Sequence, residues 1–382
     1  MDFAFTEQQQ MFRRMVRGFA ENEIAPRAEE IDVSDEFPLD LFRRMGEVGL
    51  LGLPFPAEHG GSDADYHTVV IALEEVARVS GSMAITLDAH TSLCCEPIYR
   101  FGTEAQKREY LGPLARGDRI GAFGLTEPQA GSDAGATRTL AVRDPNTDEW
   151  ILNGQKNFIT NGSVADVVVI TAKTAPALGT RGISSFIVER GTPGFRVGRD
   201  EKKMGLKGSV TSELFFEDCR IPAKNLLGSE NEGFKQFLIT LDAGRIAIAA
   251  MAVGLAEGAY ERALYYAKER EQFGRPIADF QAIRWMLADM ATEIEAARLM
   301  VHRAVWLKER GQRYTKEASM AKLFATEMSE RVCRRAIQIH GGYGYIREYE
   351  VERMYRDQRL CSIGEGTNEI QRLVISRELL KD

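Results

Sequence analysis

The stretch Trp150-Ile-Leu-Asn-Gly-Gln-Lys-Asn-Phe-Ile-Thr-Asn-Gly162 decides how the chain divides into domains. Its β-branched and aromatic residues predict a strand, and its two Asn-Gly pairs, Asn153-Gly154 and Asn161-Gly162, predict turns. Seven or so such short strands, with no helical pattern between them, predict a small barrel or sandwich and disfavour a Rossmann fold. The other clear runs are Val167–Ala172, Ile183–Val188 and Glu213–Phe216.

Helical patterns flank this region on both sides. Before it, Thr6 is a good N-cap with Gln9 as its capping-box partner, and apolar residues recur at helical spacing up to about residue 120. After Pro222 the only proline is Pro276, so long helices can run there without a break. We therefore expect a multidomain α+β protein with an α-helical domain at 1–120, a β domain at 121–230 and a helical bundle at 231–382.

The composition of the chain argues against several classes of function. The net charge of −7 is modest for 382 residues, and no long Lys or Arg block is present, so nucleic acid is not an expected partner. Five cysteines form an odd count without CxxC spacing, which predicts reduced thiols and no metal site. No signal peptide and no run of 18 apolar residues is seen, so we expect no membrane span and a cytoplasmic enzyme, or a mitochondrial matrix one if the chain is a processed eukaryotic protein.

Two motifs in the β region can bind a ligand. In Phe123-Gly-Leu-Thr-Glu-Pro-Gln-Ala-Gly-Ser-Asp133 a predicted strand enters a loop whose backbone N–H groups and hydroxyls suit a heterocycle or a phosphate. Such a loop is equally typical of a surface turn. Phe158 and Thr160 lie two residues apart, on one face of an extended segment, where one can stack on a ring and the other can hydrogen-bond its edge.

A third motif offers a carboxylate. In Ser362-Ile-Gly-Glu-Gly-Thr-Asn-Glu-Ile-Gln-Arg372, Glu365 stands between two glycines, just ahead of a plausible N-cap at Thr367. A substrate can approach the backbone closely there, because neither neighbour carries a side chain. By itself the pattern is also typical of a solvated turn.

Together with Arg270-Glu-Gln-Phe-Gly274 and Gln338-Ile-His-Gly-Gly342, these motifs resemble the acyl-CoA dehydrogenases, in the family's order and over essentially the whole chain. The resemblance implies the family's fold, a helical domain, a β-barrel and a four-helix bundle. It also implies FAD-dependent α,β-dehydrogenation of an acyl-CoA to the trans-2-enoyl-CoA in fatty acid β-oxidation. Glu365 would remove the α-proton, and hydride would pass from the β-carbon to flavin N5.

The resemblance further implies individual contacts. The residues matching family substrate contacts are Ser132, Asp242, Arg245 and Gly366, although an Asp242–Arg245 ion pair of purely structural role is the alternative. The residues matching FAD contacts are Phe123, Leu125, Thr126, Gly131, Ser132, Phe158, Ile159, Thr160, Arg270, Phe273, Gln281, Gln338, Ile339, Gly341, Gly342, Thr367, Asn368 and Glu369.

Those from Arg270 to Gly342 resemble positions through which a neighbouring subunit completes the FAD site. A homotetramer, as a dimer of dimers, is therefore expected. The family's usual electron acceptor is an electron-transferring flavoprotein.

Two positions depart from common family patterns. Gly364 replaces the Tyr of several members, which leaves the acyl preference open, and Gly244 stands where other branches carry their catalytic Glu. An acyl-CoA oxidase, a flavin monooxygenase and a DNA-associated non-catalytic relative are the alternatives on this fold. A nicotinamide dehydrogenase is disfavoured, because no GxGxxG follows a predicted strand.

Overall fold

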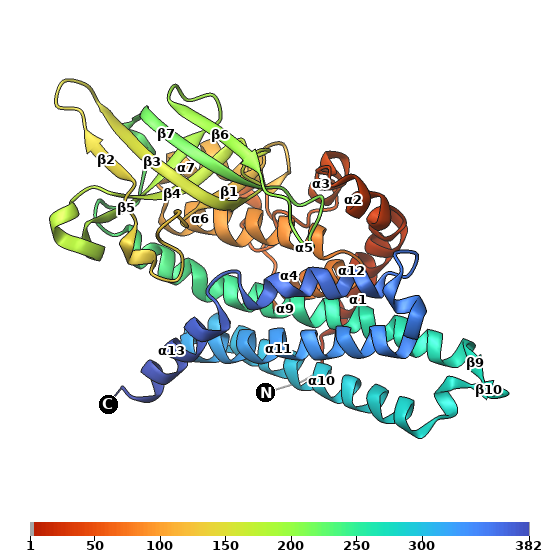
Figure 1. The fold of residues 1–382 in the computed structure, drawn as a ribbon. Coiled ribbons are helices and arrows are strands. Elements are labelled where there is room, and N and C mark those ends of the chain that lie inside the picture. Colours follow the sequence, from red (N-terminus) through yellow and green to blue (C-terminus); the bar gives the residue numbers. More distant parts are fainter. Residues whose placement is uncertain (1–3, 382) are drawn as a thin grey trace.

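The computed structural model describes residues 4–381, which form a helical region, a sheet and a second helical region in chain order; the sheet lies at the top of the view, and the C-terminal helices α10, α11 and α13 lie at the bottom (Figure 1). The predicted capping box is confirmed: the Gln9 N–H donates to Thr6 Oγ1 at 3.2 Å, and the Thr6 N–H donates to Gln9 Oε1 at 3.1 Å. The π-helical segments Ala89–Cys95 and Lys107–Leu111 join α5 to α6 and α7 to α8. The N-terminal helices are α1 (Glu7–Phe19), α2 (Ala28–Ser34), α3 (Leu39–Glu47), α4 (Tyr66–Ala77), α5 (Gly81–Asp88), α6 (Glu96–Phe101), α7 (Glu104–Gln106) and α8 (Gly112–Ala115).

The predicted middle domain of strands is confirmed as one eight-stranded sheet in the order β6-β7-β3-β2-β4-β5-β8, with β1 paired in parallel to β4. Strand β4 is buried on both faces. Val167 and Val169 pack against the N-terminal helices, whereas Val168 and Ile170 pack inside the sheet domain. The strands are β1 (Gly121–Gly124), β2 (Leu140–Arg143), β3 (Glu149–Thr160), β4 (Val167–Lys173), β5 (Ile183–Glu189), β6 (Phe195–Asp200), β7 (Thr211–Pro222) and β8 (Leu226–Leu227).

One predicted turn is wrong. Asn153-Gly154 lies inside β3, at a bulge in its pairing with β7, and only Asn161-Gly162 forms the turn that ends the strand. A Cβ on residue 154 would lie 2.5 Å from Thr139 Oγ1, so this glycine allows close contact with the neighbouring backbone. The bulge therefore serves packing between strands, which local turn signals do not reveal.

The C-terminal region contains α9 (Gly233–Glu269), α10 (Gln281–Glu309), α11 (Thr315–His340), α12 (Val351–Gln358) and α13 (Asn368–Leu379). The hairpin of β9 (Glu271–Gln272) and β10 (Arg275–Pro276) joins α9 to α10. Among residues 4–381, α9 is the one helix long and apolar enough to cross a bilayer, but 78% of its apolar window is buried inside the protein. Its hydropathy is that of a core helix, packed among α4, α10 and α11.

Candidate active site

Glu365 occupies a strained turn just before α13. Its φ is 52° and that of Gly366 is 91°, so a non-glycine residue is held in the left-handed region. The Gly366 carbonyl accepts hydrogen bonds from Lys322 Nζ and Gln371 Nε2, each at 2.8 Å. Thr367 caps α13, as predicted, by accepting from the Ile370 N–H at 3.4 Å. These bonds fix the turn that presents the Glu365 carboxylate.

The carboxylate faces Gly244 of α9. A Cβ at position 244 would lie 1.9 Å from Glu365 Oε2, so a glycine is required beneath the carboxylate as it stands. Both Glu365 oxygens are buried without a hydrogen-bond partner in the described chain. Burial raises the pKa of Glu365 well above its usual range and Asp88 adds to this, while Lys322 and Arg245 oppose it. A buried carboxylate of raised pKa suits removal of a proton from a weakly acidic C–H group.

The glycine-rich loop after β1 is organised by a buried ion pair. Glu127 Oε1 lies 2.7 Å from Lys156 Nζ, and both side chains are almost completely buried. Glu127 also accepts from the N–H groups of Arg138 and Thr139 at 2.6 and 3.1 Å. Lys156 holds the pKa of Glu127 down to about 2, despite the opposing effect of burial. The loop therefore has a fixed shape without any ligand.

The loop and the end of β3 form one surface. The Asn157 N–H donates to the Thr126 carbonyl at 2.8 Å, which brings the two predicted cofactor segments together. Phe158 has a φ of 57° and is 63% exposed, and Thr160 is half-buried. Ile159 points into the core of the sheet domain, so any cofactor contact it makes uses its backbone. An exposed ring and a hydroxyl beside a loop of accessible backbone fit a planar heterocycle.

Two of the predicted substrate contacts, Asp242 and Arg245, are paired with each other. Asp242 Oδ1 accepts from Arg245 Nη1 at 2.5 Å, and Asp242 Oδ2 accepts from Thr315 Oγ1 at 2.6 Å. The ion pair considered as the structural alternative is thus present. Arg245 Nε remains buried and without a partner in the described chain, and so is free to donate to a ligand.

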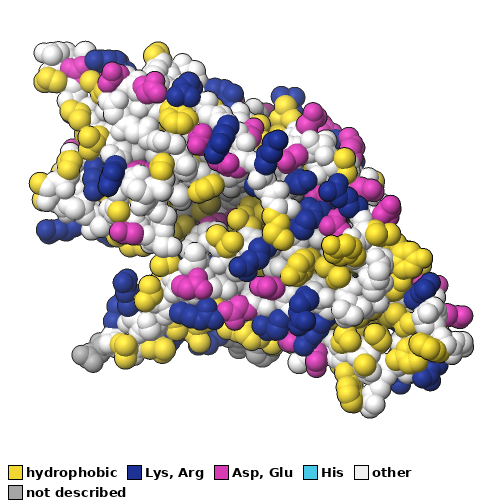
Figure 2. Space-filling model, viewed as in Figure 1, with side chains coloured by type: hydrophobic (Ala, Val, Ile, Leu, Met, Phe, Trp, Pro, Cys, Tyr) yellow, Lys and Arg dark blue, Asp and Glu magenta, His cyan; other side chains and the backbone are white. Residues whose placement is uncertain are grey.

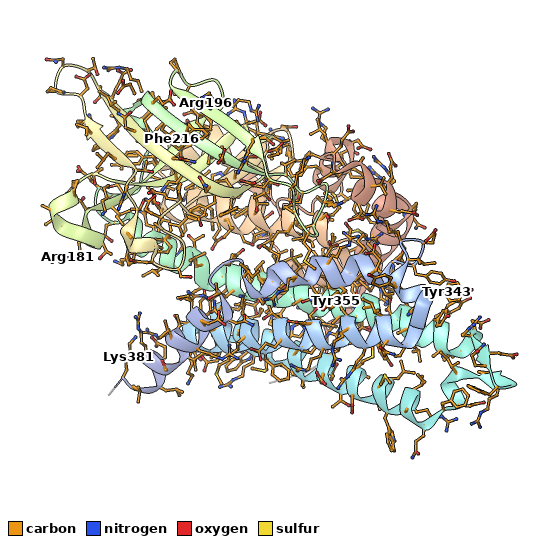
Figure 3. The ribbon with its side chains drawn as sticks, viewed as in Figure 1. Arg181, Arg196, Phe216, Tyr343, Tyr355 and Lys381 are labelled. Atoms are coloured by element: carbon orange, nitrogen blue, oxygen red, sulfur yellow. The ribbon has the colours of Figure 1, made fainter. Side chains whose placement is uncertain are left out.

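A second group of predicted cofactor residues lies at the other end of the bundle. The Arg270 guanidinium is 5.5 Å from the Tyr343 ring centroid, and Phe273 at the hairpin is 92% exposed. Lys322 and Gln338 lie on the same helix, α11, about 24 Å apart at 1.5 Å per residue. Tyr343 and Lys381 mark the opposite ends of the bundle in Figure 3. One chain does not bring the two groups together.

Two of the predicted cofactor residues, Asn368 and Ile339, have buried side chains. Asn368 is 6% exposed, and its Oδ1 accepts from Lys322 Nζ at 3.3 Å and from Thr326 Oγ1 at 3.1 Å. Ile339 is buried in the main core. In contrast, Gln338, Gly341, Gly342 and Glu369 are exposed, as are Gly131 and Ser132 in the loop after β1.

Three residues of the site were missed by the sequence reasoning. Lys156 lies on the same buried face of β3 as Trp150 and Leu152. A charged residue on such a face needs a buried partner of opposite charge. That partner is Glu127. Asp88 is likewise a charge in the otherwise uncharged segment Gly81–Cys95, and it adds to the rise in the pKa of Glu365.

The chain matches the N-terminal, middle and C-terminal domains of acyl-CoA dehydrogenase at residues 6–118, 122–219 and 231–380. The chain belongs to the acyl-CoA dehydrogenase family. It is therefore an enzyme of the oxidoreductase class, and family membership implies a flavin cofactor.

Individual relatives are similar over their full length. The probable acyl-CoA dehydrogenase YngJ of Bacillus subtilis is 55% identical over 382 residues, covering all of both chains. The caffeyl-CoA reductase-Etf complex subunit CarC of Acetobacterium woodii is 48% identical, covering 99% of each. The solved butyryl-CoA dehydrogenase of Megasphaera elsdenii has a TM-score of 0.97 and 45% identity, covering 100% of each. The family thus includes dehydrogenases and a reductase of acyl-CoA thioesters.

Proposed function

We propose that this acyl-CoA dehydrogenase family member converts an acyl-CoA thioester to the trans-2-enoyl-CoA, with Glu365 as the base that removes the α-proton. The observation that carries the proposal is the Glu365 carboxylate itself. It is buried, unpaired by any hydrogen-bond donor of the described chain, and fixed by a left-handed turn above Gly244. A group without a structural partner in so rigid a setting is available for chemistry.

The chain's own groups supply alignment and electrostatics. The α-hydrogen of a thioester is a weak acid, so its removal needs a positioned base and donors to the enolate oxygen that develops. We assign one such donor to the backbone N–H of Glu365. Displacing water from the buried site keeps the pKa of Glu365 high, which strengthens it as a base once it is ionised.

The residues fit FAD as the cofactor, and when bound it would accept the β-hydrogen as hydride. Phe158 would stack on the ring system with Thr160 at its edge, and the loop held by Glu127 would supply backbone donors to the phosphates. The loop contacts assigned are Phe123, Leu125, Thr126, Gly131 and Ser132, with Ile159 contributing its backbone. Thr367 and Glu369 would contribute from the start of α13, with Asn368 contributing its backbone.

The substrate would lie between that loop and the Glu365 turn. The space-filling view shows a notch at the left edge of the molecule, between the sheet domain and the C-terminal helices (Figure 2). Ser132 is exposed on the loop, and the Gly366 backbone lies beside the base. We assign the unpaired Nε of Arg245 to a polar group of the CoA thioester, with Asp242 holding the guanidinium in place.

The distance between the two groups of cofactor residues supports an oligomer. Arg270, Phe273, Gln281 and Gln338–Gly342 would complete the FAD site of a neighbouring subunit, within a homotetramer built as a dimer of dimers. An electron-transferring flavoprotein is the proposed electron acceptor. The Acetobacterium relative supports this, because its name makes it a subunit of a caffeyl-CoA reductase-Etf complex. We place the enzyme in the cytoplasm and in fatty acid β-oxidation.

Anaerobic titration with a panel of straight, branched and aromatic acyl-CoAs tests the function. We expect a yellow protein whose flavin spectrum is bleached by at least one thioester, with the enoyl-CoA as product. Reoxidation by electron-transferring flavoprotein, and not by oxygen, distinguishes a dehydrogenase from an oxidase. A colourless protein that gains no flavin on reconstitution, or one that no thioester reduces, contradicts the proposal.

A further inference from the structure

A lysine is buried in the helical bundle beside the turn that carries the proposed base. Lys322 of α11 is 0% exposed, and its ammonium group donates to the Gly366 carbonyl at 2.8 Å and to Asn368 Oδ1 at 3.3 Å. Neither acceptor is charged, and Lys322 forms no ion pair with another of the described residues. An ammonium group costs free energy to bury unless a charge of opposite sign lies nearby. A buried anion is therefore expected close to Lys322.

Glu365 is the carboxylate that meets this expectation. It directly precedes Gly366, so Lys322 binds the carbonyl of the next residue in the chain. Both carboxylate oxygens of Glu365 are buried and have no hydrogen-bond partner in residues 4–381. A cation without an anion and a carboxylate without a cation thus meet at one turn, where each lowers the cost of burying the other. In agreement, burial and Asp88 raise the pKa of Glu365, and Lys322 opposes them.

The other titratable groups around the turn do not supply this positive charge. Arg245 of α9 also opposes the rise in the pKa of Glu365, but its guanidinium is paired with Asp242. Lys322 is thus the buried cation at the turn that no ion pair neutralises, within the part of the chain that the structure describes. The uncharged or acidic groups facing the turn are Asp88 of α5, Tyr66 of α4, Cys361 just before the turn, and the exposed Glu369 of α13.

Gln371 of α13 offers a comparison without charge. Its Nε2 donates to the same Gly366 carbonyl, also at 2.8 Å, and its side chain is likewise 0% exposed. The two donors therefore make hydrogen bonds of equal length to a turn in which Glu365 has a φ of 52°. They differ because only Lys322 carries a charge. An effect that both residues produce belongs to the geometry of the turn, and an effect of Lys322 alone belongs to its charge.

We propose that Lys322 is a positioning residue whose hydrogen bond helps to hold the Glu365 turn, and whose positive charge favours the ionised form of Glu365 that accepts the α-proton. Lys322 gives no proton to the substrate in this role. Burial lowers the pKa of Lys322 to about 8, with Cys361 and Glu365 opposing that fall, so the ammonium form prevails at neutral pH. The inference rests on the proposed function of Glu365.

Lys322→Met and Gln371→Met test the two parts of the role, because each replaces a donor by the same unbranched apolar side chain. Both should lower kcat by about 10- to 100-fold, since a catalytic group displaced by roughly 1 Å loses rate on that scale. Only Lys322→Met should move the acid limb of kcat/KM to higher pH, by about one unit or more, because Glu365 loses the cation that favours its ionised form. Lys224→Met, which removes an exposed partner of Glu109, should change neither quantity.

The position of the acid limb decides whether the charge matters. A limb that stays in place in Lys322→Met with normal FAD content would overturn the proposal, as would a shift to lower pH. Equal shifts in Lys322→Met and Gln371→Met would assign the effect to the turn and also overturn it. Lys322→Gln loses the charge but keeps a polar head, and the same measurement on it decides the question if the Met variant does not retain FAD.

Infrared titration of the substrate-free holoenzyme keeps this inference separate from the proposed function. The band of the protonated Glu365 carboxyl is the one that Glu365→Gln lacks. It should persist to higher pH in Lys322→Met than in wild type or Gln371→Met. A band that titrates identically in all three proteins contradicts the charge effect whether or not the enzyme turns over. If the band moves while no thioester is dehydrogenated, the proposed function is wrong and the effect of Lys322 on Glu365 stands.

Discussion

Replacing Glu365 by Gln removes the proton acceptor but keeps the size and reach of the side chain. The turn should survive, because Lys322 and Gln371 bind the Gly366 carbonyl and not the carboxylate. A positioned general base contributes roughly 10²- to 10⁴-fold to rate. We therefore expect turnover to fall at least that far, which corresponds to about 3–5 kcal/mol of transition-state stabilisation.

The assay is rapid anaerobic mixing with a saturating acyl-CoA, following loss of the oxidised flavin spectrum. FAD content and product-analogue binding should persist, so that the loss is confined to the chemical step. Glu327→Gln is a matched control on α11, since it removes only an exposed pair with Arg372 and should cost little. Near-normal turnover by Glu365→Gln would refute the assignment of the base.

Because Glu365 lies against Gly244, the catalytic carboxylate can be moved from position 365 to position 244 as a second test. A Cβ at position 244 falls 1.9 Å from Glu365 Oε2, so a side chain there enters the space that the carboxylate occupies. We expect Gly244→Glu combined with Glu365→Gly to recover part of the activity that Glu365→Gly alone loses. If the double variant folds and binds FAD but is no faster than Glu365→Gly, a carboxylate at position 244 does not replace the base.

Three further outcomes are expected. Lys156→Met leaves the buried Glu127 carboxylate without its cation, so we expect a loss of about 3–5 kcal/mol in urea unfolding, with weaker FAD retention; unchanged values would contradict the role of the pair. Arg270→Ala should lower both FAD affinity and tetramer stability in sedimentation experiments, because a ligand that bridges two chains stabilises them; a normal tetramer with unchanged FAD affinity would remove that assignment. Burial lowers the pKa of His90 from 6.5 to about 4, so the unfolded chain binds the proton first and stability should fall as the pH drops from 6.5 toward 4. His90→Asn should flatten that dependence in denaturant unfolding at pH 7 and pH 5, and an equal slope in both proteins would argue against it.

Much of the fold could be predicted because its signals are local. The capping box of Thr6 and Gln9 and the N-cap at Thr367 depend on residues three positions apart, and both were predicted correctly. The error at Asn153-Gly154 has the opposite cause. An Asn-Gly pair specifies a turn only if the following chain reverses, and here β3 continues because Gly154 lets Thr139 approach.

The candidate site likewise has features that could be predicted from the sequence and features that could not. The sequence by itself determined the family and pointed to Glu365, because several family motifs can be recognised in order along the chain and one of them contains Glu365 between two glycines. It did not show that Glu127 pairs with Lys156, that Glu365 lies against Gly244, or that Asp88 raises the pKa of Glu365. Only the tertiary structure decided these, because burial and charge at an atom depend on groups far apart in the chain. The position of Glu365 could be predicted from its neighbours in sequence, whereas its strength as a base depends on its neighbours in space.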